Sequence, residues 1–222
     1  MCGIRRRGAR WSGSETDFLT HPMLRRLVGN TLRAVGLYDV VWKQLRPPPK
    51  PYPSETSKCR ARLAPYCTGY GVDLGFGGDP ITPHAVRADF PSPYAFTGAY
   101  PVQLGGDCAR LVWFKDGVLD FVYSSHLLED FEDTKSVLVE WIRVLKPGGR
   151  LVIFCPDEQR FRAHCARTGQ PYNPNHKHAH FSLEFVEGLL REIGGTQPVL
   201  RNPDVDLYSW DLVVEKLPAP AR

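Results

Sequence analysis

The sequence lacks the patterns that mark membrane-spanning, secreted and metal-binding proteins. Its 222 residues contain no apolar run near the ~18–20 residues that a membrane helix needs. Six cysteines are present, but no two of them have the CxxC spacing typical of zinc and redox motifs. The first residues carry arginines and no apolar stretch, so we expect no secretory signal. These absences together lead us to expect a cytoplasmic protein.

The chain also has little net charge, and the basic excess is concentrated near its start. The net charge is +4, while 42% of the residues are hydrophobic and 23% are charged, which is typical of a globular protein. An arginine cluster can bind phosphates or an acidic surface, but we favour a solvated basic terminus. The clustered residues are Arg5, Arg6, Arg7, Arg10, Arg25, Arg26 and Arg33.

The composition changes near residue 54, and this change predicts the domain organisation. Apolar residues recur at roughly helical spacing between Thr20 and Leu37, with arginines between them. Such a basic amphipathic helix can bind a membrane or a partner, but we favour packing on its own domain. Five prolines in residues 47–53 predict a stiff linker. We therefore predict a basic helical extension with its linker at residues 1–53 and the main domain at residues 54–222.

Short apolar segments alternate with helical patterns in the predicted main domain. The expected helices are Thr134–Leu145 and Ser182–Ile193, which Ser182 caps. This alternation predicts an α/β fold, with a Rossmann-like, doubly wound, mostly parallel sheet of about six to seven strands and an N-terminal helical extension. The expected strands are Tyr70–Leu74, Ala85–Asp89, Pro101–Leu104, Val118–Ser124, Arg150–Cys155 and Tyr208–Leu217.

A glycine-rich segment directly follows the first expected strand. In doubly wound sheets, ligands bind at the carboxyl ends of the strands, and glycines such as Gly75 and Gly77 let a ligand approach bare backbone. Asp89 ends the next strand, where a carboxylate can accept hydrogen bonds from two ribose hydroxyls. By itself this outline fits any nucleotide-type ligand, including that of a dehydrogenase.

Three further segments give the sequence a family resemblance. They are Gly106–Cys108, Leu119–Asp130 and Glu140–Ile153, and the last of them contains the turn Arg-Val-Leu-Lys-Pro-Gly-Gly at residues 143–149. Their order and spacing resemble the class I S-adenosylmethionine-dependent methyltransferases of the methyltransferase type 11 kind. The resemblance covers about Gly69–Pro156, which is under half of the chain.

The resemblance implies S-adenosylmethionine as the cofactor and assigns residues that hold it. The loop with Asp73, Gly75 and Gly77 matches the motif whose backbone meets the amino acid end of the cofactor. Asp89 matches the acid that binds the ribose. The sequence departs from the family pattern in the short, proline-containing turn at residues 78–84, where a helix usually follows the first strand.

The same resemblance assigns the adenine site and the loop that faces the reacting groups. Asp107 matches the acid that meets the adenine amino group, and the backbone N–H of Cys108 points to the ring. Ser124, Ser125 and His126 match the loop after the fourth strand, which faces the sulfonium and the substrate. Ser124 is assigned to the cofactor and Ser125 to the substrate.

The candidates for the acceptor chemistry are histidines. Methyl transfer to a hydroxyl or an amine needs a general base, and His126 is the first candidate, although it can equally pack against or cap the following helix. His176, His178 and His180 alternate along one segment, which predicts a polar lid over the substrate, a base from one histidine, or a metal site if the segment is extended. We favour the lid and predict no metal.

Further residues of that segment complete the predicted site. Within it, His176 and His178 are the further catalytic candidates, while Tyr172, Asn173 and His180 are the predicted substrate-binding groups.

From the sequence we expect a methyltransferase that acts on an O, N or C atom of a small molecule or glycan precursor. The alternatives are an RNA- or protein-directed methyltransferase and a non-catalytic binding module with the same fold. The sequence disfavours nucleic acid, because it has no recognisable RNA-binding module and no interleaved aromatic and basic residues. Ser124–Leu127 also replaces the DPPY-like tetrad of amino-directed base methylation.

Overall fold

The fold is known from a computed structural model that describes residues 54–90 and 100–219. The chain divides into two units, Met1–Pro47 and Pro48–Arg222, and the described residues belong to the second. The predicted basic helix and most of the proline-rich linker lie outside the described residues, so the N-terminal extension stays a prediction. No helix in the described part of the chain is both long and apolar enough to span a membrane.

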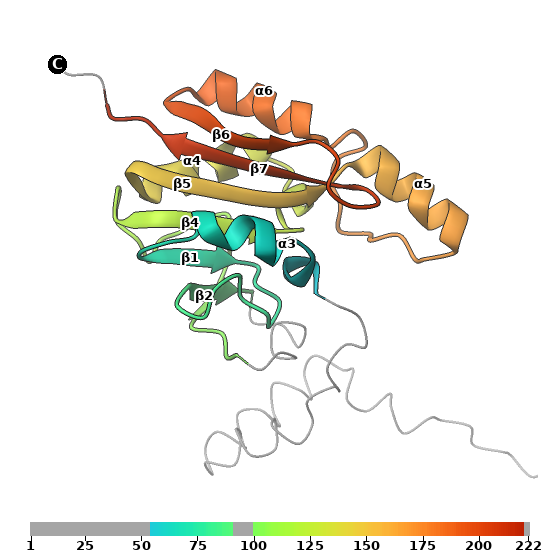
Figure 1. The fold of residues 1–222 in the computed structure, drawn as a ribbon, viewed down its shortest axis with the longest axis horizontal. Helices are drawn as coiled ribbons and strands as arrows, with labels where there is room; N and C mark the ends of the chain where they lie inside the picture. Colours follow the sequence, from blue (N-terminus) through green and yellow to red (C-terminus); the bar gives the residue numbers. More distant parts are fainter. Residues whose placement is uncertain (1–53, 91–99, 220–222) are drawn as a thin grey trace, which may run out of the picture. The chain divides into compact units, whose positions relative to one another are not determined.

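Seven strands of the described residues form one sheet in the order β3-β2-β1-β4-β5-β7-β6 (Figure 1). Neighbouring strands are parallel from β3 to β5, whereas β7 is antiparallel to both β5 and β6. The expected α/β, Rossmann-like and mostly parallel sheet is therefore confirmed. The strands are β1 (Gly71–Leu74), β2 (Val86–Asp89), β3 (Leu104–Gly105), β4 (Leu119–Ser125), β5 (Leu145–Pro156), β6 (Thr196–Asn202) and β7 (Ser209–Lys216).

Helices cover both faces of the sheet because successive side chains of the central strands point to opposite sides. On β4, Phe121 and Tyr123 pack in one buried cluster with Leu63 of α3, while Val122 packs in another with Trp141 of α4. Helix α6 belongs to the same face as α4 (Figure 1). The helices are α3 (Glu55–Leu63), α4 (Thr134–Val144), α5 (Glu158–Thr168) and α6 (Leu183–Ile193), with short 3-10 turns η2 (Ala64–Tyr66) and η4 (Leu128–Asp130).

Three elements were not predicted, each for a physical reason. Helices α3 and α5 are rich in charged and polar residues, so their apolar spacing is weak. Strand β6 lies at the edge of the sheet and contains Pro198, which is a residue that counts against a strand. The expected α6 is confirmed, since the Ser182 side chain accepts a hydrogen bond from the backbone N–H of Phe185 at 3.2 Å.

Candidate active site

The turn between β1 and β2 forms one wall of the site. This turn contains no helix. The buried carboxylate of Asp73 stabilises it, because Asp73 Oδ2 accepts a hydrogen bond from the Ile81 N–H at 2.6 Å. Gly75 and Gly77 have φ values of 66° and 58°, in the left-handed region that favours glycine. Burial raises the pKa of Asp73 well above its ordinary value. Asp73 thus supports the loop, while the partly buried glycines form its bend.

Asp89, at the end of β2, joins this turn to the neighbouring strand. Its Oδ2 accepts a hydrogen bond from the Gly77 N–H at 3.0 Å, so the two cofactor-binding candidates are in direct contact. Burial raises the pKa of the Asp89 carboxyl, and hydrogen bonds from backbone N–H groups oppose that effect.

A cavity of about 580 Å³ lies where β1, β2 and β4 end. This is the edge at which parallel sheets of this type bind ligands. The cavity gathers residues from five places: the turn after β1, the end of β2, the loop after β4, the start of α3 and the segment before α6. They are Gly75–Gly77, Asp89, Phe90, Ser125–Leu127, Asp130, Ser54–Thr56, Asn173 and Asn175.

Two residues of the cavity lining each have a buried polar atom without a hydrogen-bond partner within the described structure. The two atoms are Ser125 Oγ and Asp130 Oδ1. An unpaired buried polar atom costs about 1–3 kcal/mol, so such atoms normally have a partner. Their position therefore fits a polar ligand in the cavity.

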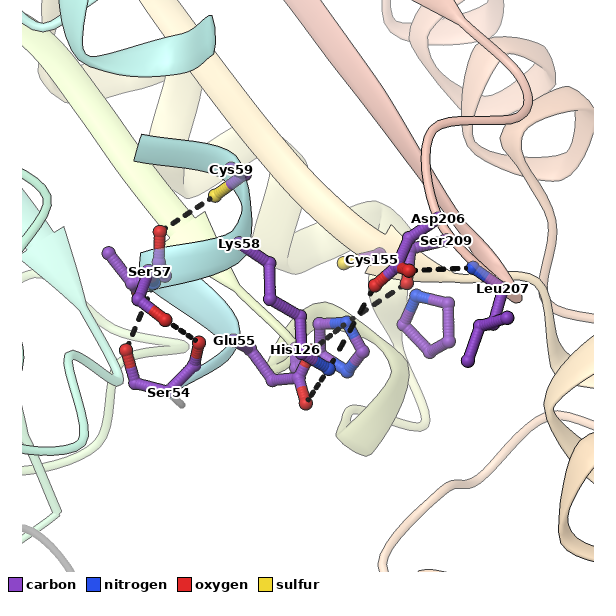
Figure 2. Close-up of polar contacts among 12 residues, drawn as sticks. Ser54, Glu55, Ser57, Lys58, Cys59, His126, Cys155, Asp206, Leu207 and Ser209 are labelled. Atoms are coloured by element: carbon purple, nitrogen blue, oxygen red, sulfur yellow. Dashed lines mark hydrogen bonds and ion pairs between the residues drawn. The ribbon is translucent and has the colours of Figure 1, made fainter. Parts of the chain in front are cut away.

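His126 lies at the rim of the cavity with a φ of 49°, which is uncommon outside glycine. Its ring Nε2 is 3.4 Å from Glu55 Oε2 and 3.4 Å from Ser209 Oγ (Figure 2). Its Nδ1 is 3.8 Å from Glu129 Oε1. Burial lowers the pKa of His126 to about 4, although the Glu55 carboxylate acts in the opposite direction. His126 is therefore neutral at neutral pH, and its ring is a weaker base than that of an exposed histidine.

A polar cluster formed by His176, Glu158 and Glu129 lies next to His126. His176 Nδ1 is 2.7 Å from Glu158 Oε2, and its Nε2 is 3.7 Å from Glu129 Oε1. Glu158 also accepts hydrogen bonds from the Tyr172 hydroxyl at 2.6 Å and from Arg162 Nε at 2.5 Å. Burial raises the pKa of Glu129 to about 8. His176 and Tyr172 thus contact this cluster, and neither belongs to the lining of the cavity.

The three alternating histidines do not share one side. His178 Nε2 lies 2.8 Å from both the Phe131 carbonyl oxygen and Thr134 Oγ1, and the exposed His180 contacts Gln159 at 2.9 Å. The segment is not extended as a strand, so the geometry required for a shared metal does not arise. Among the described residues, no group of His, Cys, Asp and Glu side chains is arranged to hold a metal ion.

Of the remaining predicted residues, some line the cavity and others lie elsewhere in the fold. Asn173 lines it, whereas Asp107, Cys108 and Ser124 do not. Asp107 is exposed and accepts a hydrogen bond from the Ala109 N–H at 2.8 Å, and Cys108 is buried in the core. Ser124 is fully buried and donates to the Leu74 carbonyl oxygen at 3.3 Å.

Sequence reasoning missed several polar groups that line the cavity, among them Glu55, Asp130 and Asn175. Glu55 belongs to a helix that was not predicted, and its place beside His126 depends on tertiary packing. Asn175 stands between Asn173 and His176, so its polar neighbourhood was the one available signal.

The fold and the cavity define a Rossmann-like α/β domain with a ligand site at the carboxyl ends of its parallel strands. Residues 67–153 match the family model described as a methyltransferase domain. This part of the chain, under half of its length, therefore resembles a methyltransferase domain.

Individual proteins match this chain in sequence or in structure. Demethylmenaquinone methyltransferase of Streptomyces griseus is 35% identical over 104 residues, which are 46% of this chain and 37% of that relative. The match therefore spans well under half the length of that curated relative.

Two solved structures share the fold at low identity. One is a methyltransferase in complex with the Haloferax volcanii Trm112 methyltransferase activator, with a TM-score of 0.57 and 16% identity over 89% of this chain and 99% of that one. The other is a Thermotoga maritima S-adenosylmethionine-dependent methyltransferase, with a TM-score of 0.55 and 21% identity over 83% of this chain and 97% of that one.

Proposed function

We propose that this chain transfers a methyl group from S-adenosylmethionine to an O, N or C atom of a small molecule or glycan precursor. The observation that carries this proposal is the cavity at the ends of β1, β2 and β4, with Asp89 bound to Gly77 at its wall. A volume of about 580 Å³ suits small-molecule ligands, for which pockets typically measure about 300–1,000 Å³.

The residues of the cavity fit the groups of this cofactor. Asp89 would accept hydrogen bonds from the ribose hydroxyls, and the bend at Gly75–Gly77 would meet the amino acid end through its backbone. Ser125 Oγ, which has no partner within the described structure, would bind a polar group of either ligand. When bound, S-adenosylmethionine supplies a methyl carbon whose bond to sulfur breaks, with its electron pair kept by the sulfur, as the bond to the acceptor forms.

In this proposal His126 is the general base for the acceptor. Its neutral ring lines the cavity and can accept a hydrogen bond from an acceptor hydroxyl or a neutral amine as the methyl group is transferred, while its lowered pKa makes it a weak base. The neighbouring Glu55 carboxylate, 3.4 Å from Nε2, would stabilise the imidazolium that forms. His176 and His178 are held by protein groups outside the lining, so the proposal gives them a supporting role.

Calorimetric titration with S-adenosylhomocysteine tests the cofactor site. Asp89→Ala should weaken binding by about 10- to 150-fold, because a hydrogen bond to a charged group contributes about 1.5–3 kcal/mol. Asp116→Ala is the matched control, since the exposed Asp116 precedes β4 at the opposite end of the sheet. Equal affinity of the Asp89 variant and the wild type would refute the ribose role, and no binding to the wild type at millimolar ligand would refute the proposal.

A further inference from the structure

One buried carboxylate holds both ends of a short segment that carries two cavity-lining asparagines. Glu158 Oε1 accepts a hydrogen bond from the Tyr172 hydroxyl at 2.6 Å, and Glu158 Oε2 lies 2.7 Å from His176 Nδ1. Between these two contacts stand Asn173 and Asn175, which line the cavity. Glu158 does not belong to the lining, so its effect on a ligand in the cavity passes through this segment.

The Glu158 carboxylate is suited to this task because it is both buried and ionised. Its side chain is 0% exposed. Burial acts to raise the pKa of Glu158, but hydrogen bonds from Tyr172, His176 and Arg162 outweigh it, so the pKa is lowered. Hydrogen bonds to an ionised group are about twice as strong as those between neutral groups. The two contacts therefore hold the segment more firmly than ordinary hydrogen bonds would.

Aromatic packing against α5 fixes the same two residues. The ring centroid of Phe161 lies 5.8 Å from that of Tyr172 and 5.1 Å from that of His176. The rings of Tyr172 and His176 are themselves 5.6 Å apart. One face of α5 thus binds both ends of the segment through a carboxylate and an aromatic ring.

The residues between the two ends form a closed turn. The Asn175 N–H donates a hydrogen bond to Asn173 Oδ1 at 3.1 Å, and the Lys177 N–H donates to the Glu129 carbonyl oxygen at 3.0 Å. The second bond connects the segment to η4, whose Asp130 also lines the cavity. Holding the ends of this turn therefore sets the position of both asparagines.

The strand order places this segment on the side of the cavity away from the proposed cofactor site. The strands run β2-β1-β4-β5, and the cofactor proposal uses the ends of β1 and β2. Helix α5 follows β5 after the single residue Asp157 and lies beyond the end of that strand (Figure 1). The segment bound to α5 thus reaches the cavity from the β5 side, which leaves its asparagines to the acceptor.

We infer that Glu158 is a positioning residue that holds Asn173 and Asn175 where they bind the methyl acceptor. A side-chain amide both donates and accepts hydrogen bonds, so the two asparagines can orient a polar acceptor. Groups that are held in place before binding lose little freedom when the ligand arrives, which favours affinity. This inference rests on the proposed methyl transfer and adds a residue outside the cavity to its acceptor site.

Hydrogen exchange of the full chain tests how the segment is held, without any ligand. Glu158→Gln keeps the size of the side chain and removes its charge, so peptides of residues 172–177 should exchange about tenfold faster than in wild type. Peptides of α6 should not change. Tyr172→Phe removes one of the two contacts and should give a smaller increase, which also serves if Glu158→Gln does not fold. Glu192→Gln, exposed on α6, is the control. Wild-type exchange of residues 172–177 in both variants would overturn the inference.

Methyl transfer tests whether acceptor binding depends on this arrangement. The full chain is incubated with tritiated S-adenosylmethionine and a dilution series of a small-molecule extract of the source organism, and labelled product is quantified. Glu158→Gln should raise the apparent KM for the acceptor, in units of extract, by about 10- to 100-fold. The kcat and the Kd of S-adenosylhomocysteine should stay within about threefold of wild type, because the groups proposed for the cofactor do not contact this segment.

A second substitution separates positioning from a general loss of structure. In a variant that carries Asn173→Ala and Asn175→Ala, Glu158→Gln should have no further effect on KM, because it acts through these two residues. An equal effect in both backgrounds, or a parallel loss of S-adenosylhomocysteine affinity in Glu158→Gln, would overturn the positioning role. Failure of the wild type to bind S-adenosylhomocysteine or to form labelled product would instead overturn the proposed function, and the acceptor role of Glu158 with it.

Discussion

The pH dependence of stability provides a direct test of how His126 is held. The ordinary pKa of histidine is 6.5, and burial lowers that of His126 to about 4. Between these values the unfolded chain binds a proton at this residue and the native protein does not, so stability falls as the pH decreases from about 6.5 to 4. Linkage gives a loss of about 2 kcal/mol in the free energy of unfolding at pH 5 relative to pH 7.5 from this residue alone.

The variant for this test is His126→Asn, because asparagine tolerates the positive φ of this position. Urea unfolding of wild type and variant at the two pH values isolates the effect, since all other titrating groups are shared. We expect the variant to gain about 2 kcal/mol relative to wild type on going from pH 7.5 to pH 5. His84→Asn, at an exposed histidine, should show no such change. The same pH dependence in wild type and His126→Asn would refute a buried, neutral His126.

Two other predictions concern neighbouring parts of the fold. The buried Glu129 has its pKa raised to about 8, so the native carboxyl stays protonated where the unfolded one ionises, and wild-type stability falls as the pH rises from about 4.5 to 8. Glu129→Gln should therefore gain about 2–3 kcal/mol relative to wild type between pH 5 and pH 7 in urea unfolding, and a constant difference would contradict this. Ser182→Ala should lower the free energy of unfolding by about 1 kcal/mol through loss of the α6 cap. Ser57→Ala is the control, because the hydroxyl of Ser57 lies on the surface of α3 and caps no helix.

The sequence was sufficient for elements with strong apolar periodicity. Strand β4 and helix α6 were placed within one or two residues, since their buried side chains recur at strand or helix spacing. Helix α5 was not predicted, because only Glu158, Phe161 and Cys165 of its residues are buried and the rest of its sequence is mostly polar. A short apolar pattern of that kind cannot be separated from a loop without the surrounding structure.

The candidate site divides in the same way. Gly77 and Asp89 follow strands that the sequence predicted, so their proximity followed from the parallel order of the sheet. The partners of His126 could not be predicted, because Glu55 precedes it by a large separation along the chain and Ser209 follows it by another. Contacts of this kind depend on how α3 and β7 pack, which no local pattern specifies.

The short turn after β1 and one side of the cavity are both in contact with α3. A helix would normally follow β1 in this fold family, yet here Asp79 and Pro80 of the turn are bound by Arg60, at 2.5 and 3.2 Å. The first turn of the same helix supplies Glu55 to the cavity. One helix therefore contacts the wall proposed for the cofactor and places Glu55 beside His126. Because both walls depend on α3, a displacement of this helix would alter cofactor and acceptor binding together.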